Sequence, residues 1–328
     1  MARLVIELTN RCNLACQHCF SGRHGGNDDL PLSVVDTILA DAYVVGIDHL
    51  TFTGGDPTVY KHFGALMKRL AEHDYRYSLV TNGFNFTTVY PQLARDKLEQ
   101  ITFSLDGATP ASHGALRGKH SYDRVLEAMQ LCGREGITFT NNMVVTRHNR
   151  HELEAALVLV KSLGSHGLRF GHLMHSPITT LQGFDLSLSE RREVEREVWA
   201  LKHKHTDFAV AMAPGFHTEE LFPCTPLHMQ EANVNMQGQL TKCCHLSSHG
   251  PEVGQGDVVC DLSETRLTEG FLKLFLHNER FKRDKLARAE GGLSDSDKSP
   301  CWYCANYFQK VDWLKEVEGH AWLEHLWT

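Results

Sequence analysis

Three cysteines near the N-terminus have the spacing of a metal-binding loop. Cys12, Cys16 and Cys19 lie in the stretch TNRCNLACQHCF with the pattern C-x3-C-x2-C. Three thiolates on one short loop can bind three irons of a four-iron cubane and leave the fourth iron without a protein ligand. Most iron–sulfur sites use four cysteines, whereas an open position accepts a substrate or cofactor, as in open zinc sites. The pattern therefore predicts a cluster with one open iron. A zinc loop is the alternative, although no fourth ligand lies at finger spacing.

Four cysteines in the C-terminal third form a second candidate metal set. Cys224 precedes Cys243, and Cys301 and Cys304 follow as a C-x2-C pair. Four thiolates are enough to close a [4Fe–4S] cluster completely. A zinc site from the same four is the alternative, because C-x2-C is common in zinc ribbons. Cys244 directly follows Cys243, and since adjacent strand residues point opposite ways, only one of the two should be a ligand. The sequence leaves open which one.

Alternating strand and helix patterns must position the N-terminal cysteines. Short β-rich runs predict strands at 3–8, 49–53, 76–81, 100–105, 138–145 and 167–173, separated by helical patterns at 31–45, 60–73, 86–97, 121–134 and 150–163. Strands separated by crossover helices form parallel sheets. Right-handed crossovers give a barrel, a partial barrel or an open doubly wound sheet. In each case the functional site lies at the C-terminal ends of the strands.

Polar stretches follow two of these strands. Gly54, Gly55 and Asp56 follow the second strand, where two glycines let the backbone approach a ligand and the carboxylate offers an acceptor for a cationic amine. An ordinary turn is the alternative for this stretch. Ser104 and Asp106 alternate at the end of the fourth strand. They are predicted to face one side, suited to ribose hydroxyls or other polar contacts, with a turn as the alternative for Asp106.

Further polar residues are candidates for the same end of the sheet. Arg117 either meets a carboxylate of a ligand or is a structural arginine, and Asn142 lies on the fifth predicted strand. His172 and His175 follow the sixth strand and are candidates to touch a substrate. Together these residues predict a polar ligand site beside the N-terminal cysteines.

The composition is that of an ordinary globular protein. Of 328 residues, 42% are apolar and 22% are charged, and the net charge is 33 − 40 = −7. No run is long enough to span a membrane, and the N-terminus lacks a signal peptide, so a cytoplasmic location is predicted. The negative charge, with no basic stripe, argues against nucleic-acid binding. In the cytosol the ten cysteines stay reduced, which favours metal ligands over disulfides.

The N-terminal motifs in combination resemble those of the radical S-adenosylmethionine (SAM) superfamily, over about residues 3–175. The resemblance implies a partial (β/α)6 TIM-like barrel whose [4Fe–4S] cluster chelates SAM through its free iron. It also implies that Asp56 holds the SAM ammonium group, in a position where the family has Glu. His18 is a departure, because the family has an aromatic residue before the third cysteine. The histidine can still present its backbone and ring to the adenine.

The C-terminal cysteines resemble the SPASM and twitch extensions of that superfamily. The segment from Cys224 through Gly238 to Cys243 matches their opening pattern, and VNMQGQLTKC has the alternation of a β-hairpin that delivers a cysteine. Nothing follows Cys304 that would ligate a further cluster, so the twitch version with one auxiliary [4Fe–4S] cluster fits better. The implied domains are the barrel at 1–187, a linking helix at 188–205 and the auxiliary-cluster domain at 206–328.

The resemblance implies an enzyme, a radical SAM oxidoreductase or maturase. Such an enzyme cleaves SAM reductively to a 5′-deoxyadenosyl radical, which abstracts hydrogen from an unactivated C–H bond. We expect flavodoxin or ferredoxin as electron donor. Among the cysteines outside the metal sets, Cys244, Cys260 and Cys132 are candidate hydrogen-atom donors, with a packing role as the alternative for each.

Three substrate and function hypotheses follow. Maturation of a ribosomal peptide, by oxidation, crosslinking or epimerisation, is preferred because it is the commoner role. The second is a dehydrogenase or epimerase of a sugar or nucleoside-type small molecule, favoured by a barrel that begins without a peptide-recognition domain. The third, from another class, is a non-catalytic iron–sulfur electron carrier or redox sensor. The open three-cysteine site argues against it, since a carrier has no use for an exposed iron.

Overall fold

The apolar runs of the chain form one continuous sheet. The computed structural model describes residues 2–21, 26–249 and 253–327. Within them the strands are β1 (Ala2–Glu7), β2 (Ile47–Thr53), β3 (Arg76–Thr81), β4 (Leu98–Ser104), β5 (Phe139–Val145), β6 (Gly167–His172), β7 (Ala209–Met212), β8 (Glu231–Val234), β9 (Gln239–Thr241) and β10 (Val258–Asp261). Their order across the sheet is β10-β9-β8-β1-β2-β3-β4-β5-β6-β7. The six predicted strands are thereby confirmed in chain order.

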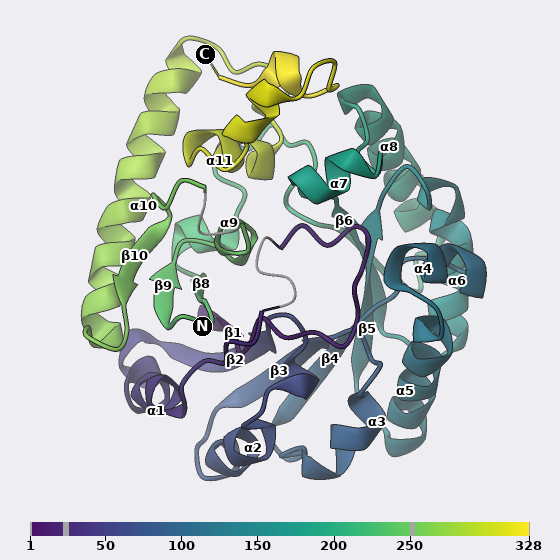
Figure 1. Ribbon diagram of the computed structural model, residues 1–328, viewed down its shortest axis with the longest axis vertical. Helices are drawn as coiled ribbons and strands as arrows, with labels where there is room; N and C mark the ends of the chain where they lie inside the picture. The colour runs from purple at the N-terminus through teal and green to yellow at the C-terminus, as the bar shows by residue number, and fades with distance from the viewer. Residues whose placement is uncertain (1, 22–25, 250–252, 328) are drawn as a thin grey trace.

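The helices follow the predicted alternation over the first half of the chain. They are α1 (Leu32–Asp41), α2 (Phe63–Ala71), α3 (Phe86–Val89), α4 (Pro110–Arg117), α5 (Ser121–Glu135), α6 (Leu153–Ser162), α7 (Pro177–Leu181), α8 (Leu188–Lys204), α9 (Cys244–Ser247), α10 (Leu267–Glu290) and α11 (Pro300–Tyr307). Strands β1 to β7 are mutually parallel. The sheet curves, with α1 to α6 outside it and the loop after β1 running across its concave side (Figure 1). This is a partial barrel.

Strand β5 shows how sequence alternation sets the two faces of the sheet. Phe139, Met143 and Val145 are buried against the outer helices, whereas Asn142 and Val144 between them are half-buried. Because side chains alternate along a strand, the second set faces the inside of the curve. The concave side is therefore where polar side chains and the N-terminal loop meet.

One predicted helix is much shorter than expected. The pattern at 86–97 forms only α3 and a 3-10 turn at Tyr90–Gln92, after which the chain is extended at Leu93. Pro91 lies inside this pattern, and proline cannot donate the backbone hydrogen bond that an α-helix needs there. The prediction for this segment was wrong for that reason.

The C-terminal strands extend the barrel sheet. Strand β8 lies parallel to β1, with Leu4 opposite Ala232, and β8 and β9 form the predicted hairpin. Gly238 in its turn has a φ of 80°, a conformation that glycine adopts without strain. Helix α8 confirms the predicted helix at 188–205 to within one residue. The division into domains stays a prediction. Strands β7 and β8 belong to the predicted auxiliary-cluster domain at 206–328, yet they pair with the barrel strands β6 and β1.

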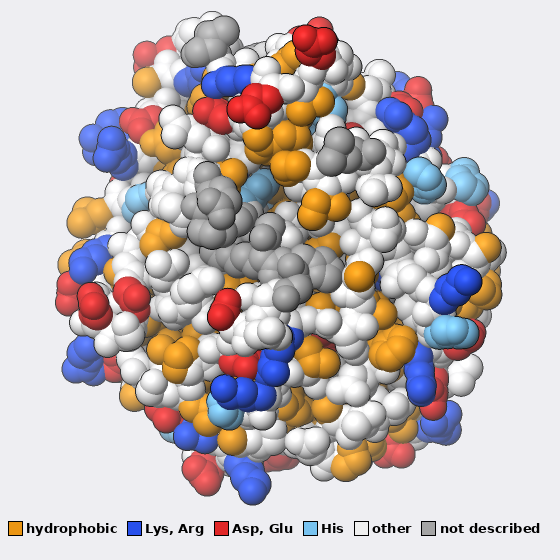
Figure 2. Space-filling model, viewed as in Figure 1, with side chains coloured by type: hydrophobic (Ala, Val, Ile, Leu, Met, Phe, Trp, Pro, Cys, Tyr) orange, Lys and Arg blue, Asp and Glu red, His pale blue; other side chains and the backbone are white. Residues whose placement is uncertain are grey.

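Surface composition varies over the face that contains the N-terminal loop. Acidic and basic side chains are interspersed around the margin of this face, and hydrophobic side chains lie between them and nearer its centre (Figure 2). Among the described helices, none combines the length and apolar character needed to cross a membrane.

Candidate functional site

The three N-terminal cysteines lie on the loop that leaves β1 and crosses the concave side of the sheet (Figure 1). All three are half-buried. The side-chain amide of Asn82 donates to Cys12 Sγ at 3.6 Å, and Arg117 Nη1 lies 3.9 Å from Cys16 Sγ. Burial raises the pKa of Cys12 to about 12 and also raises the pKa of Cys16 and Cys19. Because metal ligands must be thiolates, a bound cation would have to displace these protons.

Gly54 and Gly55 hold the cysteine loop in place. The Gly55 N–H donates to the Thr9 carbonyl at 2.6 Å. A Cβ on Gly55 would lie 2.0 Å from the Arg11 carbonyl oxygen, and one on Gly54 would lie 2.3 Å from the Thr9 oxygen. The two glycines therefore do allow a close backbone approach. The segment they approach is the backbone of Thr9 to Arg11, which leads into Cys12. Contact of these glycines with SAM stays a prediction.

The Asp56 carboxylate accepts hydrogen bonds from neighbouring residues of the protein. Its carboxylate is buried and accepts hydrogen bonds from Thr58 N–H at 2.9 Å, Asn82 N–H at 2.8 Å and Thr81 Oγ1 at 2.9 Å. Burial raises the pKa of Asp56. In this arrangement the carboxylate fixes the turns after β2 and β3, and through Asn82 it positions the amide that reaches Cys12. The carboxylate is thus already hydrogen-bonded within the protein, and its contact with the SAM ammonium group stays a prediction.

Asp106, Arg117 and His18 form a buried charge cluster behind the loop. Asp106 Oδ2 accepts from Arg117 Nε and lies 2.9 Å from His18 Nε2, while Oδ1 accepts from Val144 N–H at 2.7 Å. Burial disfavours the Asp106 carboxylate, but Arg117 and His18 outweigh this and lower its pKa. Asp106 and Arg117 bind each other, which fits the structural alternative for Arg117, and contact of either residue with a ligand stays a prediction. His18 joins the same cluster, and presentation of its backbone and ring to the adenine stays a prediction.

Ser104 and Asn142 lie side by side on the concave face. They are register partners on β4 and β5, and both are half-buried. Arg169, the register partner of Asn142 on β6, donates from Nε to Asn142 Oδ1 at 3.1 Å. Sequence reasoning missed Arg169. Its charge between buried Leu168 and Phe170 is the signal that could have found it, because the alternation places it on the polar face.

The four C-terminal cysteines are brought together. Cys224, Cys243, Cys301 and Cys304 line one cavity with Met174, Lys242, His245 and apolar side chains. A tetrahedral zinc site needs its sulfurs within about 4 Å of one another, given Zn–S bonds of about 2.3 Å. Among the described residues, no three of these sulfurs lie within 4.8 Å of one another, and the same holds for Cys12, Cys16 and Cys19. The spacing fits a multi-iron cluster better than a single ion in both places.

Two buried lysines lie beside this cavity. Lys242 is almost fully buried, with Nζ 2.5 Å from Asn278 Oδ1 and 4.3 Å from the centre of the Phe281 ring. Burial lowers its pKa to about 8, although Cys304 and Cys243 oppose the shift. Lys285 is buried against Tyr303, at 4.5 Å from the ring centre. A cluster held by four thiolates is anionic, so buried ammonium groups fit an iron–sulfur occupant.

The structure distinguishes Cys243 from Cys244. Cys243 lines the cavity, whereas Cys244 begins α9 and is absent from the lining. A hydrogen bond with Cys244 lowers the pKa of Cys243, and the same bond with burial raises the pKa of Cys244. The geometry therefore favours Cys243 as the ligand, and its coordination of a cluster stays a prediction. Cys132 is fully buried in the core, and Cys260 packs against the same core, as the packing alternative expected.

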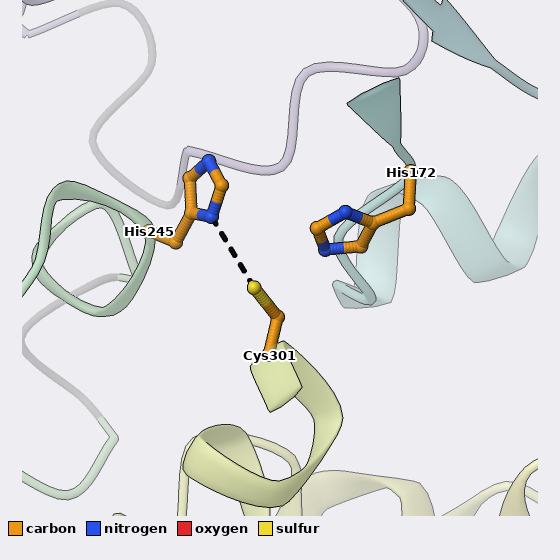
Figure 3. Close-up of side chains that lie close together, drawn as sticks. All are labelled: His172, His245 and Cys301. Atoms are coloured by element: carbon orange, nitrogen blue, oxygen red, sulfur yellow. Dashed lines mark hydrogen bonds between the residues drawn. The ribbon is translucent and has the colours of Figure 1, made fainter. Parts of the chain in front are cut away.

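The two histidines after β6 have different surroundings. His172 lies near His245 and Cys301, and these three side chains point toward one another from β6, α9 and α11 (Figure 3). His175 instead contacts Asp185 at 3.0 Å and Arg191 Nη2 at 3.3 Å. His175 thus joins the connector to α8, and only His172 lies at the cysteine cavity's edge. Sequence reasoning missed His245 and Lys242, whose positions depend on tertiary packing.

Comparison with protein families matches residues 6–160 to the model described as "Radical SAM superfamily". The mycofactocin maturase MftC of Mycobacterium tuberculosis H37Rv is 31% identical over 200 residues, which cover 60% of this chain and 51% of the relative. The chain therefore spans about half the length of the maturases it matches. A probable GTP 3′,8-cyclase of Saccharolobus islandicus is 24% identical, covering 82% of this chain and 92% of the cyclase.

Solved structures share the fold. Native anSMEcpe with bound AdoMet matches with a TM-score of 0.68 and 17% identity, covering 96% of this chain and 97% of that one. Streptococcus suis SuiB bound to precursor peptide SuiA matches with a TM-score of 0.65 and 16% identity, covering 81% and 63%. The family match begins on β1 and includes the C-x3-C-x2-C loop, and the partial barrel positions that loop on its concave side. Over residues 6–160, on the partial barrel, the chain therefore matches the radical SAM superfamily.

Proposed function

We propose that this protein is a radical SAM enzyme that oxidises a substrate C–H bond, with a ribosomally made peptide as substrate. The observation that carries the proposal is the pair of thiol sets in one fold. Three cysteines lie on the barrel loop, and four line a separate cavity. The first set leaves an iron open for SAM, and the second closes an auxiliary cluster. The names of two similar proteins, a mycofactocin maturase and SuiB bound to its precursor peptide, support the peptide.

When bound, the open-iron [4Fe–4S] cluster supplies reductive cleavage of SAM to methionine and a 5′-deoxyadenosyl radical. The chain's own residues orient and shield that chemistry. Asn82 and Arg117 place polar hydrogens at Cys12 and Cys16, and the buried Asp106 fixes the Arg117 guanidinium. Ser104, Asn142 and Arg169 offer polar contacts on the concave side for SAM or substrate.

Loss of one hydrogen atom leaves the substrate with an unpaired electron. A net two-electron oxidation then requires an acceptor for one further electron, and the accompanying proton is released to water. The cavity of Cys224, Cys243, Cys301 and Cys304 is the proposed site of that acceptor, and flavodoxin or ferredoxin is the proposed external donor for the first electron.

A second candidate is oxidation or cyclisation of a nucleoside-type small molecule. It is favoured by the extent of the sequence match. The probable GTP 3′,8-cyclase matches 82% of this chain, whereas the maturase matches 60%.

One experiment separates the candidates. Anaerobically reconstituted, reduced protein is incubated with SAM and with peptide or small-metabolite fractions of host extract, and 5′-deoxyadenosine is measured. We expect stimulation by the peptide fraction and none in the Cys12→Ala variant. Stimulation by the small-metabolite fraction alone would favour the nucleoside candidate. Absence of 5′-deoxyadenosine with every fraction would contradict both and favour a non-catalytic electron carrier.

A further inference from the structure

His245 contacts both a cavity cysteine, Cys301, and the N-terminal cysteine loop at Phe20. It lies in the first turn of α9, two residues after Cys243, and its Nδ1 is 3.6 Å from Sγ of Cys301 at the start of α11 (Figure 3). This distance is within hydrogen-bond range for a sulfur acceptor. Among the described residues, Cys301 is the one cavity cysteine whose sulfur has a side-chain hydrogen bond to a nitrogen.

Neighbouring rings hold the imidazole in this orientation. Phe20, directly after Cys19 on the N-terminal loop, packs edge-on against His245 with ring centres 6.4 Å apart. His172 packs on it at 5.7 Å, also edge-on. The ring is therefore clamped between the loop of the first cysteine set and the end of β6. Its nitrogen is directed at the second cysteine set.

The direction of the hydrogen bond follows from the acceptor. A cysteine that ligates iron is a thiolate and can only accept, so Nδ1 of His245 must carry the hydrogen. Such a bond withdraws electron density from the sulfur and stabilises the more negative, reduced state of a cluster. Hydrogen bonds to cluster sulfurs are among the factors that set reduction potential.

We propose that His245 is a positioning residue of the auxiliary cluster, donating Nδ1–H to the Cys301 thiolate and thereby raising the reduction potential of that cluster. The inference rests on the proposed function, because it requires a cluster in the four-cysteine cavity. Its consequence is that the cavity's occupant accepts the substrate's electron more readily than it would without this bond.

The test is a redox titration of full-length, reconstituted protein, followed by electron paramagnetic resonance. His245→Phe keeps a ring and removes the donor. His245→Asn puts an amide N–H close to the position of Nδ1, and His245→Gln puts it near Nε2 instead. His249→Phe is the matched control, because His249 is buried against Phe20 at 5.8 Å without a bond to a cavity sulfur. A Cys12→Ala, Cys16→Ala, Cys19→Ala preparation assigns the auxiliary signal.

We expect a lower auxiliary-cluster potential in His245→Phe and His245→Gln, and a potential near that of the unsubstituted protein in His245→Asn and His249→Phe. Iron and sulfide content shows that each variant holds its cluster. An unchanged potential in cluster-loaded His245→Phe and His245→Gln, or an equal shift in His249→Phe, would overturn the role of His245. Absence of any auxiliary signal in the unsubstituted protein, with SAM cleavage intact, would remove the auxiliary cluster and this inference with it.

Discussion

Arg117 and Asp106 form a buried charge pair beside the N-terminal cysteine loop. Each was predicted either to contact a ligand or to have a structural role, and the structure pairs them in a buried cluster with His18. Their charges are mutually satisfied, and Arg117 still reaches Cys16 Sγ. The cluster therefore acts on the cysteine loop through position and charge.

Asp106→Asn leaves Arg117 buried without its partner charge. We expect the free energy of unfolding to fall by about 3–5 kcal/mol, since removing one partner of a buried pair leaves an uncompensated charge. Anaerobic urea denaturation measures this. Asp36→Asn is the control, because Asp36 and Arg69 form an exposed pair whose loss should cost far less. Equal losses in both variants would contradict the assignment.

Cys243 and Cys244 can be separated by single substitutions. We expect Cys243→Ala to lose the auxiliary cluster's iron and sulfide, and Cys244→Ala to keep it, because only Cys243 lines the cavity. Iron and sulfide analysis with electron paramagnetic resonance checks both. The opposite result would make Cys244 the ligand. The first turn of α9 would then have to rotate so that the Cys244 side chain faces the cavity.

The N-terminal cysteine set and the Cys301–Cys304 pair were predictable because their spacing is local in sequence, and Cys224 and Cys243 were added by the resemblance to the twitch pattern. Two residues that line the cavity, Lys242 and His245, were not predicted. Lys242 is placed by its contacts with Asn278 and Phe281 of α10, and His245 by the packing of α9 against α11. No periodic pattern in the sequence encodes these contacts.

At the scale of elements, short-range patterns predicted the strands well. Strand β3 was predicted at its observed bounds, since β-branched and aromatic residues bounded by polar turns mark strands. Helix α4 was missed, although Thr109 caps it with Pro110 in its first turn. Its glycine and histidine have low helix propensity and weaken the helical pattern of this segment.

The glycines after β2 link two elements, and Gly55→Ala tests that link. A Cβ would lie 2.0 Å from the Arg11 carbonyl oxygen, so the cysteine loop must move. We expect loss of the N-terminal cluster with the auxiliary cluster retained, measured by electron paramagnetic resonance. Gly133→Ala on α5 is the control, because its nearest neighbour is 3.9 Å away and alanine favours helix. A variant that keeps both clusters would show that the loop tolerates the displacement.

At the scale of the whole molecule, the sheet joins the two thiol sets. Strand β1, which leads into Cys12, has β2 on one side and β8 on the other. The hairpin of β8 and β9 leads directly into Cys243. The sheet thereby fixes both cysteine-bearing loops to one rigid frame.

Removing the C-terminal strands should therefore unfold the barrel. We expect a fragment of residues 1–205 to lack a cooperative thermal transition, because it leaves the buried edge of β1 without β8. Circular dichroism measures this against the full chain. A fragment that melts cooperatively near the full chain's midpoint would show instead that the barrel is an independent folding unit.

The pairing of β1 with β8 also bears on synthesis. Arg3 lies opposite Glu231, so 228 further residues must be translated before the β8 side of the first strand can be paired. At about 5–20 residues per second, that interval is roughly 11–46 seconds. During it the nascent chain presents an unpaired strand edge and three free thiols on the ribosome. Both are then open to chaperones and to oxidation, before the polypeptide can close its own sheet.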